Sequence, residues 1–220
     1  MSKSEMERSL DRPLRGVLEH MQTRIMTKTS WFGVQAFKNP LDFWIYQELI
    51  FESKPDVVDE IGNHTGGGAL ALAHLCDFIG HGEVIGIDVN HTFVPQKVKE
   101  HPRISLVTGD ACESHDLVME MIGKRENVLV IEDSAHTYDN TLRVLRAYAH
   151  LIRPGNYFIV EDSICHHGLN VGPSPGPYEA IEKFLAEDDT FEIDAERESF
   201  LITWNPKGYL KKRTDRILGG

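Results

Sequence analysis

The chain has 220 residues, of which 41% are hydrophobic and 26% charged, which is ordinary usage for one globular domain. Its formal net charge of −11 disfavours a nucleic-acid partner, because an acidic surface repels a phosphate backbone. The three cysteines form no CxxC pair, no apolar run is long enough to cross a membrane, and the N-terminus is charged from the start, so we expect a cytoplasmic protein that binds no membrane.

Helices dominate the first quarter of the chain. Residues 5–30 predict one or two amphipathic helices, and residues 42–54 predict a helix with Phe43, Tyr46 and Ile50 on one face. Helices in this place cover either a ligand site or an oligomer interface, and the sequence does not choose between the two.

From residue 56 onward, short β-branched runs alternate with helical stretches, which predicts an α/β, doubly wound, Rossmann-like sheet. Five runs with apolar cores predict parallel strands buried on both faces, at 56–62, 83–89, 104–110, 127–133 and 157–163. The clearest helices between them are 67–79 and 137–152. The runs 191–197 and 200–206 predict a closing antiparallel hairpin, which completes the seven-stranded methyltransferase pattern.

This order divides the chain into three parts. Residues 1–54 are expected to be a helical cap or oligomerisation segment, and residues 55–206 the sheet domain. Residues 207–220 are interpreted as a solvated basic tail that contains Lys207, Lys211, Lys212, Arg213 and Arg216.

Each of the five central strands ends in an acidic residue, and the first is followed by a glycine-rich turn. In open α/β sheets, ligands bind beyond the carboxyl ends of the strands. The turn after the first strand follows an acid-x-Gly-x-x-x-Gly pattern, which is typical of S-adenosylmethionine sites and has neither Walker nor GxGxxG spacing. The residues of this turn that we expect at the cofactor are Glu60, Gly62, Asn63, His64, Gly66 and Gly67.

Two further acids extend the predicted cofactor site. Asp88 ends the second strand, where a carboxylate can accept hydrogen bonds from both ribose hydroxyls. Asp110 ends the third strand and is placed either beside the adenine amine or as a cap of the following helix.

The predicted metal site combines Asp133, Glu161 and Asp162 from the ends of two adjacent strands. Three carboxylates repel one another unless a cation lies between them, and oxygen ligands without cysteine favour Mg²⁺ or Ca²⁺. His136 lies three residues after Asp133 and can act as a general base or merely cap a helix. The Gly- and Pro-rich run 167–177 predicts a loop over the site, as a substrate lid or a plain connector.

Together these stretches resemble the cephalosporin hydroxylase/rhamnosyl O-methyltransferase family and, more distantly, the macrolide sugar O-methyltransferases. The residues that carry the resemblance lie within 31–206: Trp31-Phe-Gly-Val, Lys38-Asn-Pro40, Trp44-Ile-Tyr-Gln-Glu-Leu-Ile50, Lys54-Pro-Asp, Glu60-Ile-Gly, Gly86-Ile-Asp88, Asp133-Ser-Ala-His136, Glu161-Asp162 and Pro175-Gly-Pro177. The chain departs from the family in Gly66-Gly-Gly68 and in Glu132, a position that is usually aliphatic.

The resemblance implies an enzyme that transfers a methyl group from S-adenosylmethionine to a hydroxyl of a sugar or natural product. It also implies Mg²⁺ on Asp133, Glu161 and Asp162, His136 and Asp133 as catalytic residues, and a homo-oligomer. Two alternatives stay open: an iron-dependent oxygenase, which would need two histidines and one carboxylate, and a non-catalytic accessory protein that binds S-adenosylmethionine.

Overall fold

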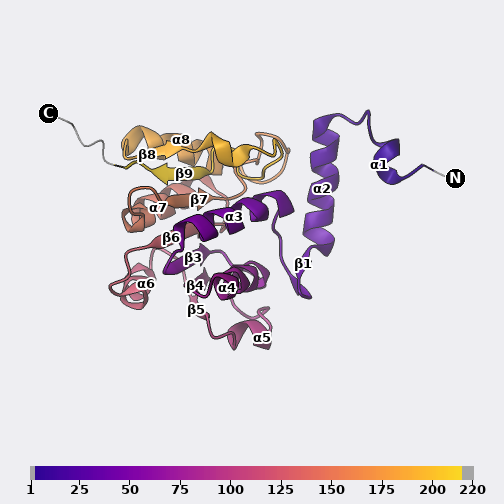
Figure 1. Ribbon diagram of the computed structural model, residues 1–220. Helices are drawn as coiled ribbons and strands as arrows, with labels where there is room; N and C mark the ends of the chain where they lie inside the picture. Colours follow the sequence, from indigo (N-terminus) through magenta and orange to yellow (C-terminus); the bar gives the residue numbers. More distant parts are fainter. Residues whose placement is uncertain (1–2, 215–220) are drawn as a thin grey trace.

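A mostly parallel sheet forms the centre of the computed structural model, which describes residues 3–214 (Figure 1). Within these residues the main sheet has the order β5-β4-β3-β6-β7-β9-β8. Its strands are β3 (Val57–Ile61), β4 (Glu83–Asp88), β5 (Ile104–Thr108), β6 (Val128–Glu132), β7 (Tyr157–Val160), β8 (Phe191–Ile193) and β9 (Tyr209–Lys212). The strands β3 to β7 run parallel, and β9 is antiparallel to both of its neighbours. The predicted doubly wound α/β class is confirmed.

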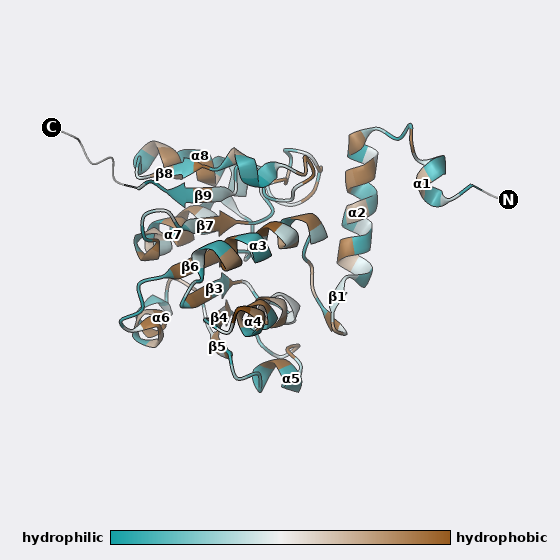
Figure 2. Ribbon diagram, viewed as in Figure 1, coloured by the Kyte–Doolittle hydropathy of each residue, from teal (hydrophilic) through white to brown (hydrophobic). Residues whose placement is uncertain are grey.

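Helices cover both faces of the sheet, and each face has its own buried apolar cluster. One face is covered by α3 (Pro40–Ser53), α4 (Gly67–Ile79) and α5 (Gln96–Lys99). The other is covered by α6 (His115–Ile122), α7 (Tyr138–Tyr148) and α8 (Pro177–Glu187). Short 3₁₀ helices, η1 (Ala149–Leu151) and η2 (Ala195–Glu198), follow α7 and β8. Figure 2 shows the central strands as largely hydrophobic, as expected for strands buried on both faces.

The N-terminal region forms two helices, α1 (Glu5–Arg8) and α2 (Leu14–Lys28), and a small hairpin, β1 (Ser30–Trp31) and β2 (Val34–Gln35). Figure 1 shows α2 on the side of the sheet away from the C-terminus. Leu18 and Ile25 of α2 belong to a third buried cluster with Ile164, Leu169 and Trp204. In residues 3–214, no helix combines the length and the apolarity that crossing a membrane requires.

The second strand of the predicted closing hairpin is wrong in position. Residues 200–206 form turns and loop, and the strand that pairs with β8 and β7 is β9. The apolar side chains that suggested a strand, Ile202 and Trp204, pack instead in the cluster that contains α2. Asp42 of α3 also holds this loop, since its carboxylate accepts hydrogen bonds from the Thr203 hydroxyl and the Trp204 N–H.

The sheet therefore extends past residue 206, the expected end of the sheet domain, to β9. Lys211 and Lys212, which were interpreted as part of a solvated tail, lie in β9, and their ammonium groups lie over the rings of Tyr157 and Phe191 at 5.6 and 5.4 Å. Arg216 lies outside the described residues.

Candidate active site

The carboxyl ends of three neighbouring strands bring the acidic residues together. β3, β6 and β7 are adjacent in the sheet, and Glu60, Asp133 and Glu161 lie at or just after their ends. The chain stays in register past the ends of β6 and β7, where the Asp133 N–H bonds to the Ile61 carbonyl at 2.8 Å and the Glu161 N–H to the Glu132 carbonyl at 2.8 Å. The sheet topology alone thus concentrates carboxylates at this edge.

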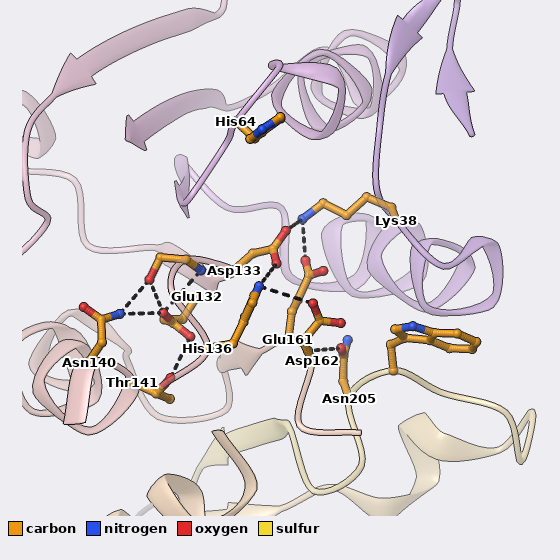
Figure 3. Close-up of polar contacts among 12 residues, drawn as sticks. Lys38, His64, Glu132, Asp133, His136, Asn140, Thr141, Glu161, Asp162 and Asn205 are labelled. Atoms are coloured by element: carbon orange, nitrogen blue, oxygen red, sulfur yellow. Dashed lines mark hydrogen bonds and ion pairs between the residues drawn. The ribbon is translucent and has the colours of Figure 1, made fainter. Parts of the chain in front are cut away.

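Lys38 lies at the centre of this acidic group. Its Nζ contacts Asp133 Oδ2 at 2.6 Å and Glu161 Oε1 at 2.6 Å (Figure 3). It also contacts Glu60 Oε1 at 3.1 Å. Burial alone would lower the pKa of Lys38, but the three carboxylates outweigh it and raise that pKa well above its usual value. Lys38 is therefore charged, and it neutralises one of the negative charges gathered here.

His136 lies on the other side of Asp133. Its Nε2 is 3.3 Å from Asp162 Oδ2 and 3.8 Å from Asp133 Oδ1. Burial alone would lower the pKa of His136, but Asp162 and Asp133 outweigh it and raise the pKa above its usual value. In the described part of the chain, Asp133, His136 and Asp162 form the one group whose ligand atoms lie close enough to hold a metal ion.

The backbone at His136 and Asp162 is strained. Their φ angles are 53° and 55°, in the left-handed region that residues with a side chain seldom adopt. Such strain is maintained only where the surrounding structure over-determines it, and it concentrates at functional sites. Asp162 is fixed in this conformation in part by Asn205, whose Oδ1 accepts the Asp162 N–H at 3.3 Å.

The predicted triad of acids is thus divided between Lys38 and His136. The chain leaves β7 at Val160, so that Glu161 and Asp162 no longer alternate strictly as in a strand. Glu161 points to Lys38, Asp162 points to His136, and Asp133 contacts both (Figure 3).

The glycine-rich turn follows β3 and opens α4. A Cβ on Gly62, whose φ is +93°, would lie 2.1 Å from the Asp133 carbonyl oxygen, and a Cβ on Gly67 would lie 2.0 Å from that of Gln35. Gly66 is the N-cap of α4 in the left-handed region. Glycine is therefore required at Gly62, where the turn packs against the segment after β6, and at Gly67, where it packs against the end of β2.

The remaining residues of the predicted cofactor site are placed as follows. Asp88 accepts the N–H groups of His64 at 2.8 Å and Asn90 at 3.0 Å. The Asn63 side chain turns away and its Oδ1 lies 2.9 Å from His91 Nε2. Asp110 accepts the N–H groups of Cys112 and Glu113 in the turn that follows it and pairs with Arg143. The N-cap of α6 is Ser114, so the alternative that Asp110 caps this helix is wrong.

One cavity of about 560 Å³ extends from the acidic group around Asp133 to the predicted cofactor residues, and its size is typical of ligand sites. The predicted residues that line it are Gly62, His64, Asp88, Asp110, Asp133, His136 and Asp162. Glu60, Asn63, Gly66, Gly67 and Glu161 are not among its lining residues, and neither is the predicted lid, residues 167–177. The loop residue His167 instead stacks on Tyr178 at 3.6 Å and contacts Glu179.

Sequence reasoning missed the residues that come from outside the sheet. Gln22, Ile25 and Met26 of α2 line the cavity, together with Phe37 and Trp204. The role of Lys38 was also missed, because Lys38-Asn-Pro40 was used only as a match to the family and nothing in its spacing points to an ion pair. What could have drawn attention to it is the excess of carboxylates at the strand ends, which requires a cation.

The comparisons with known proteins place the chain in a family. Its sequence matches the family "Rhamnosyl O-methyltransferase/CmcI" over residues 23–213. The rhamnosyl O-methyltransferase of Mycobacterium tuberculosis (strain ATCC 25618 / H37Rv) is 32% identical over 195 residues, which cover 84% of this chain and 79% of that protein. The enzyme of the same name from Mycobacterium leprae (strain TN) is 30% identical over 202 residues, 86% and 85% of the two chains.

Solved structures agree on the fold. A structure of CmcI with Mg and SAM has a TM-score of 0.66 at 24% identity and covers 84% of this chain and 77% of its own. An O-methyltransferase from Bacillus cereus in complex with SAH has a TM-score of 0.56 at 16% identity, with 85% and 86% covered. The resemblance predicted from the sequence is confirmed: the chain belongs to the rhamnosyl O-methyltransferase/CmcI family and is an S-adenosylmethionine-dependent O-methyltransferase.

Proposed function

We propose that this enzyme methylates a hydroxyl group of a sugar or sugar-bearing natural product, with Mg²⁺ at Asp133 and Asp162 and His136 as the general base. The observation that carries the proposal is that a metal-compatible acidic group and a histidine line the same cavity as Gly62, Asp88 and Asp110, which are predicted to bind the cofactor. The names of the relatives in Mycobacterium tuberculosis and Mycobacterium leprae support a rhamnosyl acceptor.

The residues present fit a divalent cation. Burial raises the pKa of Asp133 to about 6, an effect that Lys38 and His136 oppose, so the site gains from additional positive charge. The candidate ligand atoms of Asp133, His136 and Asp162 lie within 4.8 Å of one another. Carboxylate oxygens favour Mg²⁺, and we propose Glu161 as a third acidic ligand, as the resemblance implies. When bound, Mg²⁺ would lower the pKa of the acceptor hydroxyl and neutralise the carboxylates beside His136.

The same group argues against the iron-dependent alternative. A non-haem iron oxygenase typically uses two histidines and one carboxylate on one face. In residues 3–214, the candidate metal group contains one histidine and two aspartates.

His136 is suited to take the proton of the acceptor. It lines the cavity, its Nδ1 is buried without a hydrogen-bond partner, and its Nε2 faces the two aspartates. In the transfer, the acceptor oxygen forms a bond to the methyl carbon, the sulfur–methyl bond breaks, and the hydroxyl proton passes to His136. S-adenosylhomocysteine and the methyl ether are the products.

The cavity wall formed by α2 is proposed as the acceptor side. Ile25, Met26, Phe37 and Trp204 supply apolar surface, and Gln22 is fixed by the Trp204 indole N–H, which donates to its Oε1 at 2.6 Å. A sugar presents both hydroxyls and an apolar C–H face, and such a wall matches the latter. We therefore propose that α2 contributes to acceptor binding.

The direct test is methyl transfer from radiolabelled S-adenosylmethionine to a set of rhamnose-bearing glycosides, after chelation and after Mg²⁺ is added back. We expect transfer that chelation abolishes and Mg²⁺ restores. Transfer of equal rate with the chelator would contradict the metal requirement, and transfer to amines or thiols instead of hydroxyls would contradict the acceptor class. The variant Lys97→Met, an exposed lysine whose Nζ contacts only the Phe32 carbonyl in the structure, is a control that should keep wild-type transfer.

A further inference from the structure

Glu132 is a buried carboxyl group at the end of β6, next to the acidic site but on the opposite side of the strand. It is fully inaccessible to solvent, and it shares its face with Val128 and Val130, which pack in the cluster covered by α6, α7 and α8. A buried carboxyl group is unfavourable unless it is hydrogen-bonded. The neighbours on this face are apolar, so packing alone does not explain the glutamate.

The hydrogen-bond partners of the Glu132 carboxylate all come from the segment that carries His136. Its Oε1 accepts the Ser134 hydroxyl, the Ser134 N–H at 3.4 Å and the Asn140 amide at 3.4 Å, and its Oε2 accepts the Thr141 hydroxyl at 3.3 Å (Figure 3). Asn140 Nδ2 also donates to Ser134 Oγ at 2.7 Å. Glu132 therefore ties the turn after β6 to the first turn of α7.

The turn that Glu132 holds is the one that presents the base. Asp133, Ser134 and His136 all line the cavity, and His136 has the strained φ of 53°. Thr137 caps α7, where its hydroxyl accepts the Asn140 N–H at 3.3 Å. His136 thus lies between two fixed points, the Ser134 contact with Glu132 and the capped start of α7, and both are linked through Asn140.

The contacts of Asn140 continue toward Asp110, one of the predicted cofactor residues. Asn140 Oδ1 accepts from Arg143 at 3.4 Å, and Arg143 pairs with Asp110, which lines the far part of the cavity. The side chains from Glu132 to Asp110 therefore form one connected series beside the cavity.

We infer that Glu132 is a positioning residue, which through its bonds to Ser134 and Asn140 sets the orientation of the His136 imidazole. The importance of that orientation for catalysis rests on the proposed role of His136 as base, whereas the orientation itself does not. The acceptor that the arrangement requires is the oxygen that faces Ser134 and Asn140. An isosteric glutamine keeps an oxygen there and can donate its NH2 group to the Thr141 hydroxyl oxygen, so it fulfils the same role. A leucine of similar size, which has no acceptor, does not.

The test follows the His136 ring directly. The full-length protein is labelled with ¹⁵N-histidine, and the imidazole signal of His136 among the 11 histidines is identified by its loss in His136→Gln. We expect Glu132→Leu to shift or broaden that signal beyond the variation between wild-type preparations, and Glu132→Gln to leave it at the wild-type position. A wild-type signal in folded Glu132→Leu, or an equal displacement in Glu132→Gln, overturns the inference.

Two further variants keep the test decisive. Asp59→Leu removes another fully buried carboxyl group, from the neighbouring strand β3, whose oxygens have no hydrogen-bond partner in the structure. It should leave the His136 signal unchanged, and an equal displacement there overturns the inference. If Glu132→Leu does not fold, Ser134→Ala removes the first contact and should displace the signal; an unchanged signal there overturns the inference as well. Loss of His136 as base would show in transfer rates and not in these spectra.

Discussion

The two ends of the cavity hold their carboxylates in different ways. At the end proposed for the cofactor, Asp88 accepts two backbone N–H groups, from His64 and Asn90, and both donors lie in the turns beside it. At the other end, Asp133 contacts two side-chain nitrogens: Lys38 lies 95 positions earlier in the chain, and His136 has a strained backbone.

This difference in how the carboxylates are held indicates a different role for each end of the cavity. Backbone donors are fixed by the fold, so the contacts of Asp88 form whatever the cavity contains. The acidic cluster around Asp133 is held by side-chain nitrogens, and a divalent cation can compete with these for the carboxylates, as expected of a metal site. The contrast generates four predictions, given in order of decreasing expected effect.

Replacing the proposed general base, His136, should slow methyl transfer without changing the affinity for the cofactor at the other end of the cavity. His136→Gln is expected to lower kcat by roughly 10²- to 10⁴-fold, the usual contribution of a general base. Calorimetric titration with S-adenosylhomocysteine should give a wild-type dissociation constant. Retained turnover would remove His136 as the base, and a weakened affinity for S-adenosylhomocysteine would show that the two ends are not separable.

Removing the internal cation should destabilise the fold. Lys38→Met leaves Glu60, Asp133 and Glu161 buried without their partner, and we expect the free energy of unfolding to fall by about 3–5 kcal/mol, the usual result of breaking a buried ion pair. Chemical denaturation measures this, with the exposed Lys97→Met as control. A loss as small as that of the control would mean that the acids need no cation.

Asp59 in β3 shows what happens to a buried carboxyl group without any cation. Burial raises its pKa to about 8, with a smaller contribution from Glu60. Because the folded pKa lies above the unfolded value, the group favours folding only while protonated. The free energy of unfolding should fall between about pH 4 and pH 8, by about 1.4 kcal/mol per pH unit at most.

The comparison for this prediction is Asp59→Asn, which cannot ionise. Denaturation curves of the two proteins should converge near pH 4, and the wild type should be the less stable above pH 8. Parallel profiles of unfolding free energy against pH for the wild type and Asp59→Asn would contradict a raised pKa at Asp59.

The smallest effect is expected at the cofactor end. Asp88→Ala removes the proposed ribose contact, and we expect the affinity for S-adenosylhomocysteine to fall roughly 10- to 150-fold, which corresponds to about 1.5–3 kcal/mol for a hydrogen bond to a charged group. Asp110→Ala is the matched control. Both carboxylates accept backbone N–H groups, but Asp110 is also neutralised by its ion pair with Arg143, which Asp88 lacks within the described residues, so the effect of Asp110→Ala should be smaller. The reverse order would assign the cofactor to Asp110.

The parts of the fold that follow from local pattern were predictable. The helix expected at 67–79 is α4 with the same bounds, and the five parallel strands lie within their predicted ranges, because runs buried on both faces are apolar throughout. The hairpin strand at 200–206 was not predictable, since its apolar residues face α2, a contact between distant segments. β9, in contrast, contains only Tyr209 and Leu210 as apolar residues beside two lysines.

The candidate active site was likewise predictable only where local pattern decides its geometry. The strand-end acids could be placed at one edge because parallel strands end together. The pairing of Glu161 with Lys38 and of Asp162 with His136 could not be predicted. Lys38 reaches the site from a loop before α3, and the directions of the two acids depend on the turn after β7. Long-range contacts decide both.

The most direct test of the account is a calorimetric titration of Mg²⁺ into chelator-treated protein saturated with S-adenosylhomocysteine. We predict saturable binding at one site, which is lost when Asp133 and Asp162 are both changed to asparagine, while S-adenosylhomocysteine still binds. Absence of Mg²⁺ binding to the wild type, or unchanged binding to the double variant, would contradict the proposal that these acids form a metal site.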